Sequence, residues 1–131
     1  MYALIAKPKG TFSEVVEKAT TALANEGFGI LTQIDVKQTM KKKLDLDKNP
    51  YLILGACNPE LANRAMDAEP DIGVLLPCNV VVREEDSGEV VVSIMNPKAA
   101  MQMTDNEEVS KVANEAWVKL ERIQKALNEN V

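Results

Sequence analysis

The first third of the chain alternates between an extended apolar pattern and a helical one. Residues 2–7 have the pattern of a first strand. Thr11 and Glu14 have the spacing of a capping box, in which each side chain satisfies the backbone N–H of the other residue at a helix start. Apolar residues then recur at helical spacing until Gly27, a typical left-handed helix stop. Residues 28–36 predict a second strand.

The middle of the chain carries a polar stretch followed by a strongly apolar one. Residues 37–43 predict either a helical turn or a loop, and their lysine run is most simply a solvated face. Residues 51–57 predict a third strand. Asn58 and Pro59 fit the N-cap and the first position of a short helix, because proline has a suitable fixed φ and lacks only an N–H that would be unpaired there. We expect that helix to end before Pro70.

Two further strands are predicted next. Residues 72–83 read as a fourth strand that is irregular at Pro77, and residues 89–95 read as a fifth. Asp86-Ser87-Gly88 predicts the turn that joins them as a hairpin.

The last third of the chain predicts one long amphipathic helix. A loop around Pro97 leads to Thr104, which is expected to cap the helix together with Glu107. Its apolar stripe consists of Val109, Val112, Ala113, Ala116, Trp117, Leu120, Ile123 and Leu127. No repeat, low-complexity segment or linker interrupts the chain, so a single domain over residues 1–131 is predicted.

The order of elements predicts an α+β fold. The predicted order is a strand, a long helix, four strands and a second long helix, with a short helix after the third strand of the chain. This order is typical of an α+β fold with a mostly antiparallel sheet of about five strands. The two long helices would cover one face of this sheet. Three strands nevertheless carry apolar residues at consecutive positions, as in Leu52-Ile53-Leu54, Val80-Val81-Val82 and Val90-Val91-Val92. A second subunit or a ligand is therefore expected on the other face.

Composition and charge exclude several classes of protein. A chain of 131 residues that is 46% hydrophobic and 27% charged is a folded protein rather than a disordered one. Its formal net charge of −5 argues against a nucleic-acid partner, which would need a basic surface. The chain has no histidine, so catalytic triads and the commonest zinc ligand are excluded.

The sequence also predicts a cytoplasmic protein without a membrane partner. The longest apolar stretch, residues 72–82, is too short and too interrupted to span a bilayer. The first residues do not have the pattern of a signal peptide. In a reducing cytoplasm the two cysteines are expected to be free thiols.

The candidate site consists of two similar segments, Gly55-Ala56-Cys57-Asn58-Pro59 and Leu75-Leu76-Pro77-Cys78-Asn79-Val80. Each places Cys-Asn beside a proline, one at the end and one near the start of successive strands. If those strands are antiparallel, both segments lie at the same edge of the sheet, and the two cysteines approach each other. A ligand pocket is then predicted between them, because a helix N-terminus offers N–H donors to small or anionic molecules.

Each residue of this candidate site has an expected role. Asn58 is expected to cap its helix, whereas Asn79 has no such task and is free to hold a ligand. Cys57 is the best candidate for a reactive residue, with Cys78 as its partner. Because Cys57 precedes a helix start, its pKa is expected to lie below the roughly 8.5 of a free cysteine. Burial would have the opposite effect on that pKa.

The same two segments resemble the family known as domain of unknown function 302, a set of small prokaryotic proteins. The resemblance rests on Leu54-Gly55-Ala56-Cys57-Asn58-Pro59 and Leu75-Leu76-Pro77-Cys78-Asn79-Val80-Val81-Val82 and covers nearly the whole chain. It implies a TATA-binding-protein-like α+β fold with a curved antiparallel sheet, and commonly a homodimer. It implies no activity, and the similar fold is not an argument for DNA binding, because function resides in sites.

Three hypotheses of function follow. The first is a homodimeric binding or assembly module, in which the cysteines pack as small apolar residues. The second is a sulfur-transfer or redox protein that uses Cys57, with Cys78 as the resolving or supporting thiol. The third is a metal site, with zinc held by thiolates from two chains or by thiolates and carboxylates. Whether the protein is an enzyme stays open.

Overall fold

A five-stranded antiparallel sheet organises the molecule, and the computed structural model describes residues 1–129 of the chain. The strand order is β1-β5-β4-β3-β2, so sequence neighbours from β2 to β5 pair side by side and β1 closes the far edge. The strands are β1 (Ala3–Ala6), β2 (Gly29–Asp35), β3 (Tyr51–Cys57), β4 (Cys78–Glu84) and β5 (Val90–Met95). The α+β class and the antiparallel sheet predicted from the pattern are confirmed.

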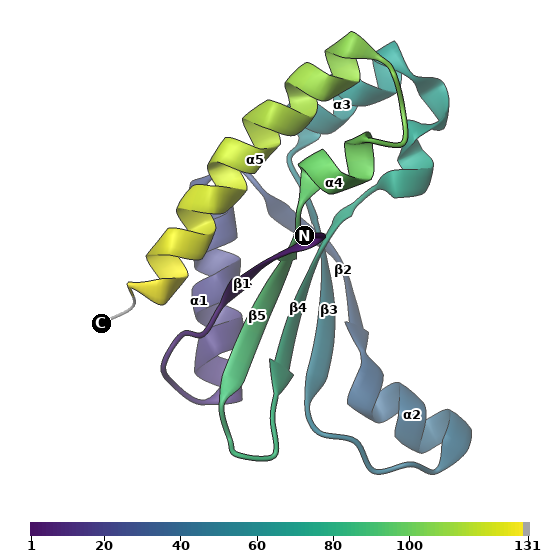
Figure 1. Cartoon of the computed structure of the whole chain (residues 1–131). Coiled ribbons are helices and arrows are strands. Elements are labelled where there is room, and N and C mark those ends of the chain that lie inside the picture. The colour runs from purple at the N-terminus through teal and green to yellow at the C-terminus, as the bar shows by residue number, and fades with distance from the viewer. Residues whose placement is uncertain (130–131) are drawn as a thin grey trace.

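Two long helices, α1 (Phe12–Asn25) and α5 (Glu107–Asn128), pack against each other and against one face of the sheet (Figure 1). We call the face of the sheet against which these helices pack the helix-covered face. Alternate strand residues supply its core, because successive side chains of a strand point to opposite faces. The buried strand residues of this face are Ala6, Leu52, Leu54, Ala56, Cys78, Val80, Val82, Val90, Val92 and Ile94.

Local signals at the first helix are as the sequence predicts. Thr11 accepts a hydrogen bond from the Glu14 N–H at 3.2 Å, and the Glu14 carboxylate accepts one from the Thr11 N–H at 2.8 Å. Gly27, just beyond the helix, has a φ of +85°. This is the left-handed region, which glycine enters without a steric penalty.

The polar stretch after β2 forms a full helix, α2 (Val36–Leu44). Asp35 starts it, since its carboxylate accepts a hydrogen bond from the Gln38 N–H. None of its residues is buried. This helix therefore lacks the apolar stripe that made α1 easy to predict from the sequence. Of the two alternatives predicted for this stretch, the helical one is correct.

The prediction that residues 72–83 form one strand is wrong in its first half. After α3 (Pro59–Ala68), residues Pro70–Leu75 form a short 3₁₀ helix, η1, and β4 begins only at Cys78. Pro70 favours this start because its fixed φ suits a helical turn. Of the apolar residues of η1, Ile72 belongs to the core and is only 2% exposed, whereas Val74 is 86% exposed.

The segment before the last helix also differs from expectation. Residues Pro97–Met101 form a short helix, α4, where a loop was predicted, and Asn96 caps it. The N-cap of α5 is Asn106 rather than Thr104, because the Asn106 side chain accepts from the N–H groups of Glu108 and Val109. The Thr104 hydroxyl donates instead to the Glu69 carboxylate.

The second face of the sheet, which we call the open face, is apolar along one row. Ladder partners place Ile34, Ile53, Val81 and Ile5 in this row, with Ser93 between the last two. Ile34 is 50% exposed and Ile5 is 37% exposed. The expectation of apolar residues on both faces is therefore met by the arrangement of the strands. No helix among residues 1–129 combines the length and apolarity needed to cross a membrane.

Candidate functional site

Cys57 and Cys78 lie at one end of the sheet, on neighbouring antiparallel strands. Cys57 is the last residue of β3 and Cys78 is the first residue of β4. Ala56 is the direct ladder partner of Cys78, so the two cysteines are one residue out of register. The predicted common edge is thus present. Figure 1 shows α3, α4 and the start of α5 gathered around this end.

Asn58 shapes the turn from β3 into α3. Its side-chain oxygen accepts from the Leu61 N–H at 3.2 Å, and its amide nitrogen donates to the Glu26 carbonyl at 3.5 Å. Pro59 occupies the first turn of the helix. The side chain of Asn58 is therefore engaged in capping, as the sequence predicts, and it holds α3 against the end of α1.

A small cavity of about 40 Å³ lies beside the two cysteines. A space of roughly 10–15 Å³ accommodates one water, so this cavity has room for a few non-hydrogen atoms. We call it the thiol cavity. Its lining residues are Phe28, Ala56, Cys57, Asn58, Leu61, Ala62, Ala65, Leu76, Pro77, Cys78, Pro97, Met101, Val112, Ala113 and Ala116. The two predicted segments therefore do border a common cavity.

The walls of the thiol cavity are almost entirely apolar. Besides the backbone, the only polar groups in its lining are the two thiols and the Asn58 amide. Cys78 is buried, whereas Cys57 is partly exposed. A ligand entering from solvent would therefore meet the more exposed Cys57 before Cys78.

The electrostatic environment contradicts the expectation of an acidic Cys57. Burial raises the pKa of the Cys57 thiol above its ordinary value. Burial raises the pKa of Cys78 further, to about 11, and the nearby Cys57 thiolate contributes to that increase. Desolvation by the apolar walls disfavours a thiolate more than the nearby helix start stabilises it. The predicted lowering of the Cys57 pKa is therefore wrong.

Asn79 does not join the other predicted site residues. It pairs with Gly55 across the ladder, and its side chain is exposed. Because strand residues alternate between faces, Asn79 lies on the open face while its neighbour Cys78 lies on the helix-covered face. It is not among the residues that line the thiol cavity. The structure thus separates Asn79 from Cys57, Asn58 and Cys78.

Gly55 makes the close packing at this end of the sheet possible. A Cβ atom at this position would overlap the Thr32 hydroxyl and would lie 2.9 Å from Cγ of Pro77. The absence of a side chain therefore lets Pro77, which precedes Cys78, approach β3. Close packing alone therefore explains why glycine occupies position 55 of the Gly55-Ala56-Cys57 segment.

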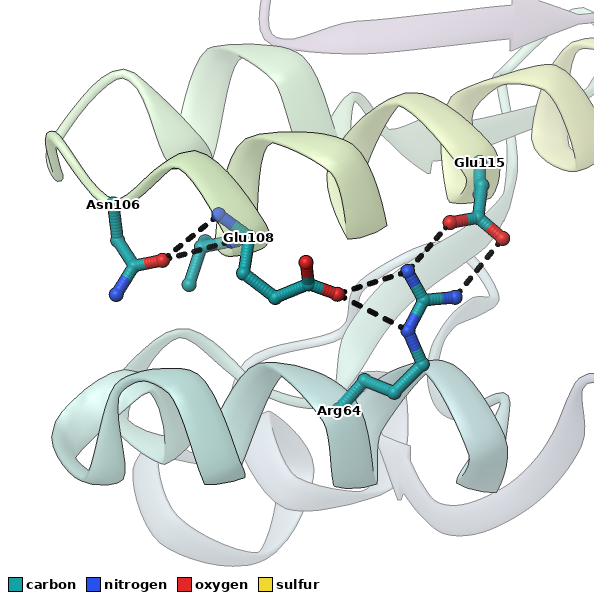
Figure 2. A network of polar contacts seen from close by, with 5 residues as sticks. Arg64, Asn106, Glu108 and Glu115 are labelled. Carbon is teal, nitrogen blue, oxygen red and sulfur yellow. Dashed lines mark hydrogen bonds and ion pairs between the residues drawn. The ribbon is translucent and has the colours of Figure 1, made fainter.

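A polar network holds two walls of the cavity together. The Arg64 guanidinium of α3 lies between the carboxylates of Glu108 and Glu115 on α5, with N···O distances of 3.1 and 2.7 Å (Figure 2). Next to it, the Asn106 amide donates to the Ala68 carbonyl at the end of α3. The hydrogen bond from the Arg64 guanidinium, together with its charge, lowers the pKa of Glu115. The network fixes the spacing of α3 and α5, which contribute Ala62, Ala65, Val112, Ala113 and Ala116 to the cavity.

Sequence reasoning missed two features of this site. Met101, only 8% exposed, reaches the cavity from α4, a segment for which a loop was predicted. The signal for α4 was Asn96-Pro97, the same Asn-Pro pair that starts α3. Arg64 was also missed; the only trace in the sequence is the seven-residue spacing of Glu108 and Glu115, which places both carboxylates on one side of a helix.

Comparison with known proteins identifies the family. The model of the family described as "Domain of unknown function DUF302" matches residues 5–129. The chain belongs to this family. The resemblance carried by the two Cys-Asn segments is therefore confirmed.

A solved structure from the DUF302 family has the same fold. The crystal structure of an uncharacterized conserved DUF302 protein from Bacillus stearothermophilus superimposes with a TM-score of 0.88. The two proteins are 26% identical over 97% of this chain and 98% of the other. None of the curated proteins compared with the chain matches it. Family membership thus establishes the fold of this DUF302 protein, and its activity has to be argued from the site.

Proposed function

We propose that this protein is a binding module that holds a small ligand in the thiol cavity. The observation that carries the proposal is the convergence of Cys57 and Cys78 on one preformed, mostly apolar cavity. Ligand sites are typically concave and apolar, with a small number of polar groups at defined positions. The volume of about 40 Å³ limits the buried part of the ligand to a few atoms.

The chemistry of the cavity favours binding over covalent catalysis. A nucleophilic cysteine needs a base or a lowered pKa to be present as thiolate at neutral pH. Here the pKa values of both thiols are raised by burial. The chain has no histidine to act as a base, and Asn58 is engaged in capping. Sulfur transfer or redox chemistry at Cys57 is therefore the weaker candidate.

We further propose that the protein is a cytoplasmic homodimer that associates through the open face. The row formed by Ile5, Ile34, Ile53 and Val81 spans the sheet from edge to edge and is partly solvent-exposed in the single chain. Ser93 interrupts the row between Val81 and Ile5, but exposed apolar surface of this kind is still typical of an interface. Both cysteines are free thiols, which fits a reducing compartment.

Xenon is a suitable probe of the cavity, because it enters small apolar cavities without needing polar contacts. We expect xenon pressure to shift the backbone amide resonances of residues that line the thiol cavity. Ala116→Leu, which adds a side chain into the cavity, should abolish these shifts. Ala126→Leu, at an exposed position of the same helix, should leave them unchanged.

The same experiment can refute the proposed cavity. If the wild-type spectrum shows no change under xenon, the cavity does not admit a ligand. If the shifts persist in Ala116→Leu, xenon occupies another place. Thermal melting of both variants shows whether each remains folded.

A further inference from the structure

Sulfur-containing side chains gather in the thiol cavity. The chain has two cysteines and six methionines, and within residues 1–129 both cysteines and Met101 line this one cavity. They come from three different elements, since Cys57 ends β3, Cys78 begins β4 and Met101 ends α4. The tertiary structure therefore assembles two thiols and a thioether that lie far apart in the sequence.

The remaining lining offers almost nothing to a hard or borderline metal ion. Carboxylate, carbonyl and water oxygens suit magnesium, calcium and manganese, and imidazole suits zinc. The side chains that line the cavity include no carboxylate, and the chain has no histidine. In the described part of the chain, no group of three or more Cys, Asp or Glu side chains gathers to hold a metal ion. Thiolate and thioether sulfur together suit Cu(I). Thiolate also binds zinc, but a structural zinc site takes four ligands, and only three sulfur-containing side chains line this cavity.

We propose that the thiol cavity binds one Cu(I) ion through the Sγ atoms of Cys57 and Cys78 and the Sδ atom of Met101. This inference rests on the proposed function, whose ligand it names. A single ion fits a cavity of about 40 Å³, whereas most organic ligands do not. Binding forms three copper–sulfur bonds, copper remains Cu(I), and the two S–H protons pass to solvent.

The exposure of the three ligands provides a route for the ion. Cys57 is partly exposed, while Cys78 is 9% exposed and Met101 is 8% exposed. An ion would therefore meet Cys57 first and then reach the two buried sulfur atoms. The surrounding apolar walls keep water away from the bound ion. The Arg64 network joins α3 and α5, which supply part of the apolar wall around the three sulfur-containing side chains.

The test is an anaerobic titration of the reduced protein with Cu(I) in competition with a chromogenic Cu(I) chelator. We expect one equivalent of Cu(I) per chain, and X-ray absorption should show three sulfur neighbours. Cys57→Ser and Cys78→Ser should each abolish competition with the chelator. Met101→Leu should lower the affinity by about tenfold and reduce the sulfur neighbours to two.

Met103→Leu is the matched control, because Met103 is close in sequence but 76% exposed and outside the cavity. It should bind Cu(I) like the wild type. Circular dichroism and thermal melting establish that each variant is folded. If Cys78→Ser does not fold, Cys57→Ser and Met101→Leu still decide the outcome.

Three results would overturn the inference. They are no Cu(I) binding by the wild type, unchanged affinity in Cys57→Ser or Met101→Leu, and stoichiometric Zn(II) binding without Cu(I) binding. Xenon shifts at the cavity together with absent Cu(I) binding would refute the copper site and leave the binding cavity standing. Absence of both would refute the two proposals together.

Discussion

At the scale of single residues, burial decides the chemistry of the two cysteines. Cys57 directly precedes a helix N-cap, a position that stabilises a thiolate by only about 0.3–1 kcal/mol. The apolar walls around it have the larger effect, because its pKa is raised rather than lowered. Cys78 is more deeply buried, and its pKa is raised to about 11. Both side chains are therefore neutral thiols at neutral pH.

Alkylation with iodoacetamide should distinguish the two thiols. In the folded protein we expect Cys57 to react more slowly than a free cysteine at pH 7, because a raised pKa leaves less thiolate. Its rate should increase about tenfold per pH unit and continue to increase above pH 8.5. Cys78 should stay protected. Comparing Cys78→Ser, which retains Cys57, with Cys57→Ser assigns the rates, and a plateau below pH 8.5 would contradict the raised pKa of Cys57.

Gly55 should be intolerant of even one added carbon. Gly55→Ala would force a Cβ atom against Thr32 and Pro77, so we expect the free energy of unfolding to fall by about 1–3 kcal/mol. Gly29→Ala is the control on the neighbouring strand, since no atom lies within 4 Å of its Cβ position. Urea denaturation measures both variants. Equal effects would show that the close packing at Gly55 is not the cause.

At the scale of elements, the site depends on how α3, α4 and α5 meet the end of the sheet. Each of these helices begins at an asparagine whose side chain caps it, namely Asn58, Asn96 and Asn106. Asn58 also contacts Glu26 beyond α1, and Asn106 contacts Ala68 at the end of α3. The caps therefore set where each helix starts and also tie it to a neighbouring element.

The Arg64 network should make a small, salt-dependent contribution to stability. Arg64→Gln removes the ion pairs with Glu108 and Glu115, so we expect a slightly lower thermal midpoint. The difference from wild type should shrink in high salt, because these side chains are partly exposed. Arg83→Gln, which removes the longer 3.6 Å pair with Glu85, is the control and should have less effect.

The same network predicts a pH dependence. Arg64 lowers the pKa of Glu115 in the folded state. The stabilisation that follows is complete above the pKa of an unfolded glutamate, about 4.3, and is lost as the pH falls through the lower folded value. Thermal melts of wild type and Arg64→Gln should therefore converge in acid. A difference that grows on acidification would contradict this assignment.

At the scale of the whole molecule, the two faces of the sheet differ in what covers them. The helices α1 and α5 pack on one face, and the open face carries an apolar row with Ile34 half-exposed. Antiparallel sheets commonly present a polar face to water. An apolar row at this place is explained by the proposed association of two copies.

Disruption of the open face should dissociate the proposed dimer. We expect the wild type to sediment as a dimer at micromolar concentration. Ile34→Glu should weaken association by about 100-fold or more, because it places an unpaired charge in the interface. Val118→Glu is the matched control, since Val118 is 46% exposed on α5, away from the open face. A wild-type monomer, or equal effects of both variants, would refute the interface.

The sequence determined the parts of this protein that depend on local interactions. Neighbours within a few residues determine the Thr11–Glu14 capping box, the Asn58-Pro59 helix start and the strands. These features can therefore be predicted from the sequence alone. The antiparallel sheet followed from the hairpin and from two long helices set apart from an otherwise consecutive series of strands. The common edge of Cys57 and Cys78 followed from that order.

Only the tertiary structure decided the features that depend on distant partners. An apolar run such as residues 72–76 suits a strand and a buried 3₁₀ turn equally well, and the core decides between them. Asn79 was expected near the ligand. Because successive side chains of a strand point to opposite faces, Asn79 lies on the open face and Cys78 on the helix-covered face. The convergence of Met101 with the cysteines required α4 to pack against α5 at the end of the sheet. The thiol pKa values depend on how completely the walls exclude water, which is a property of the assembled fold.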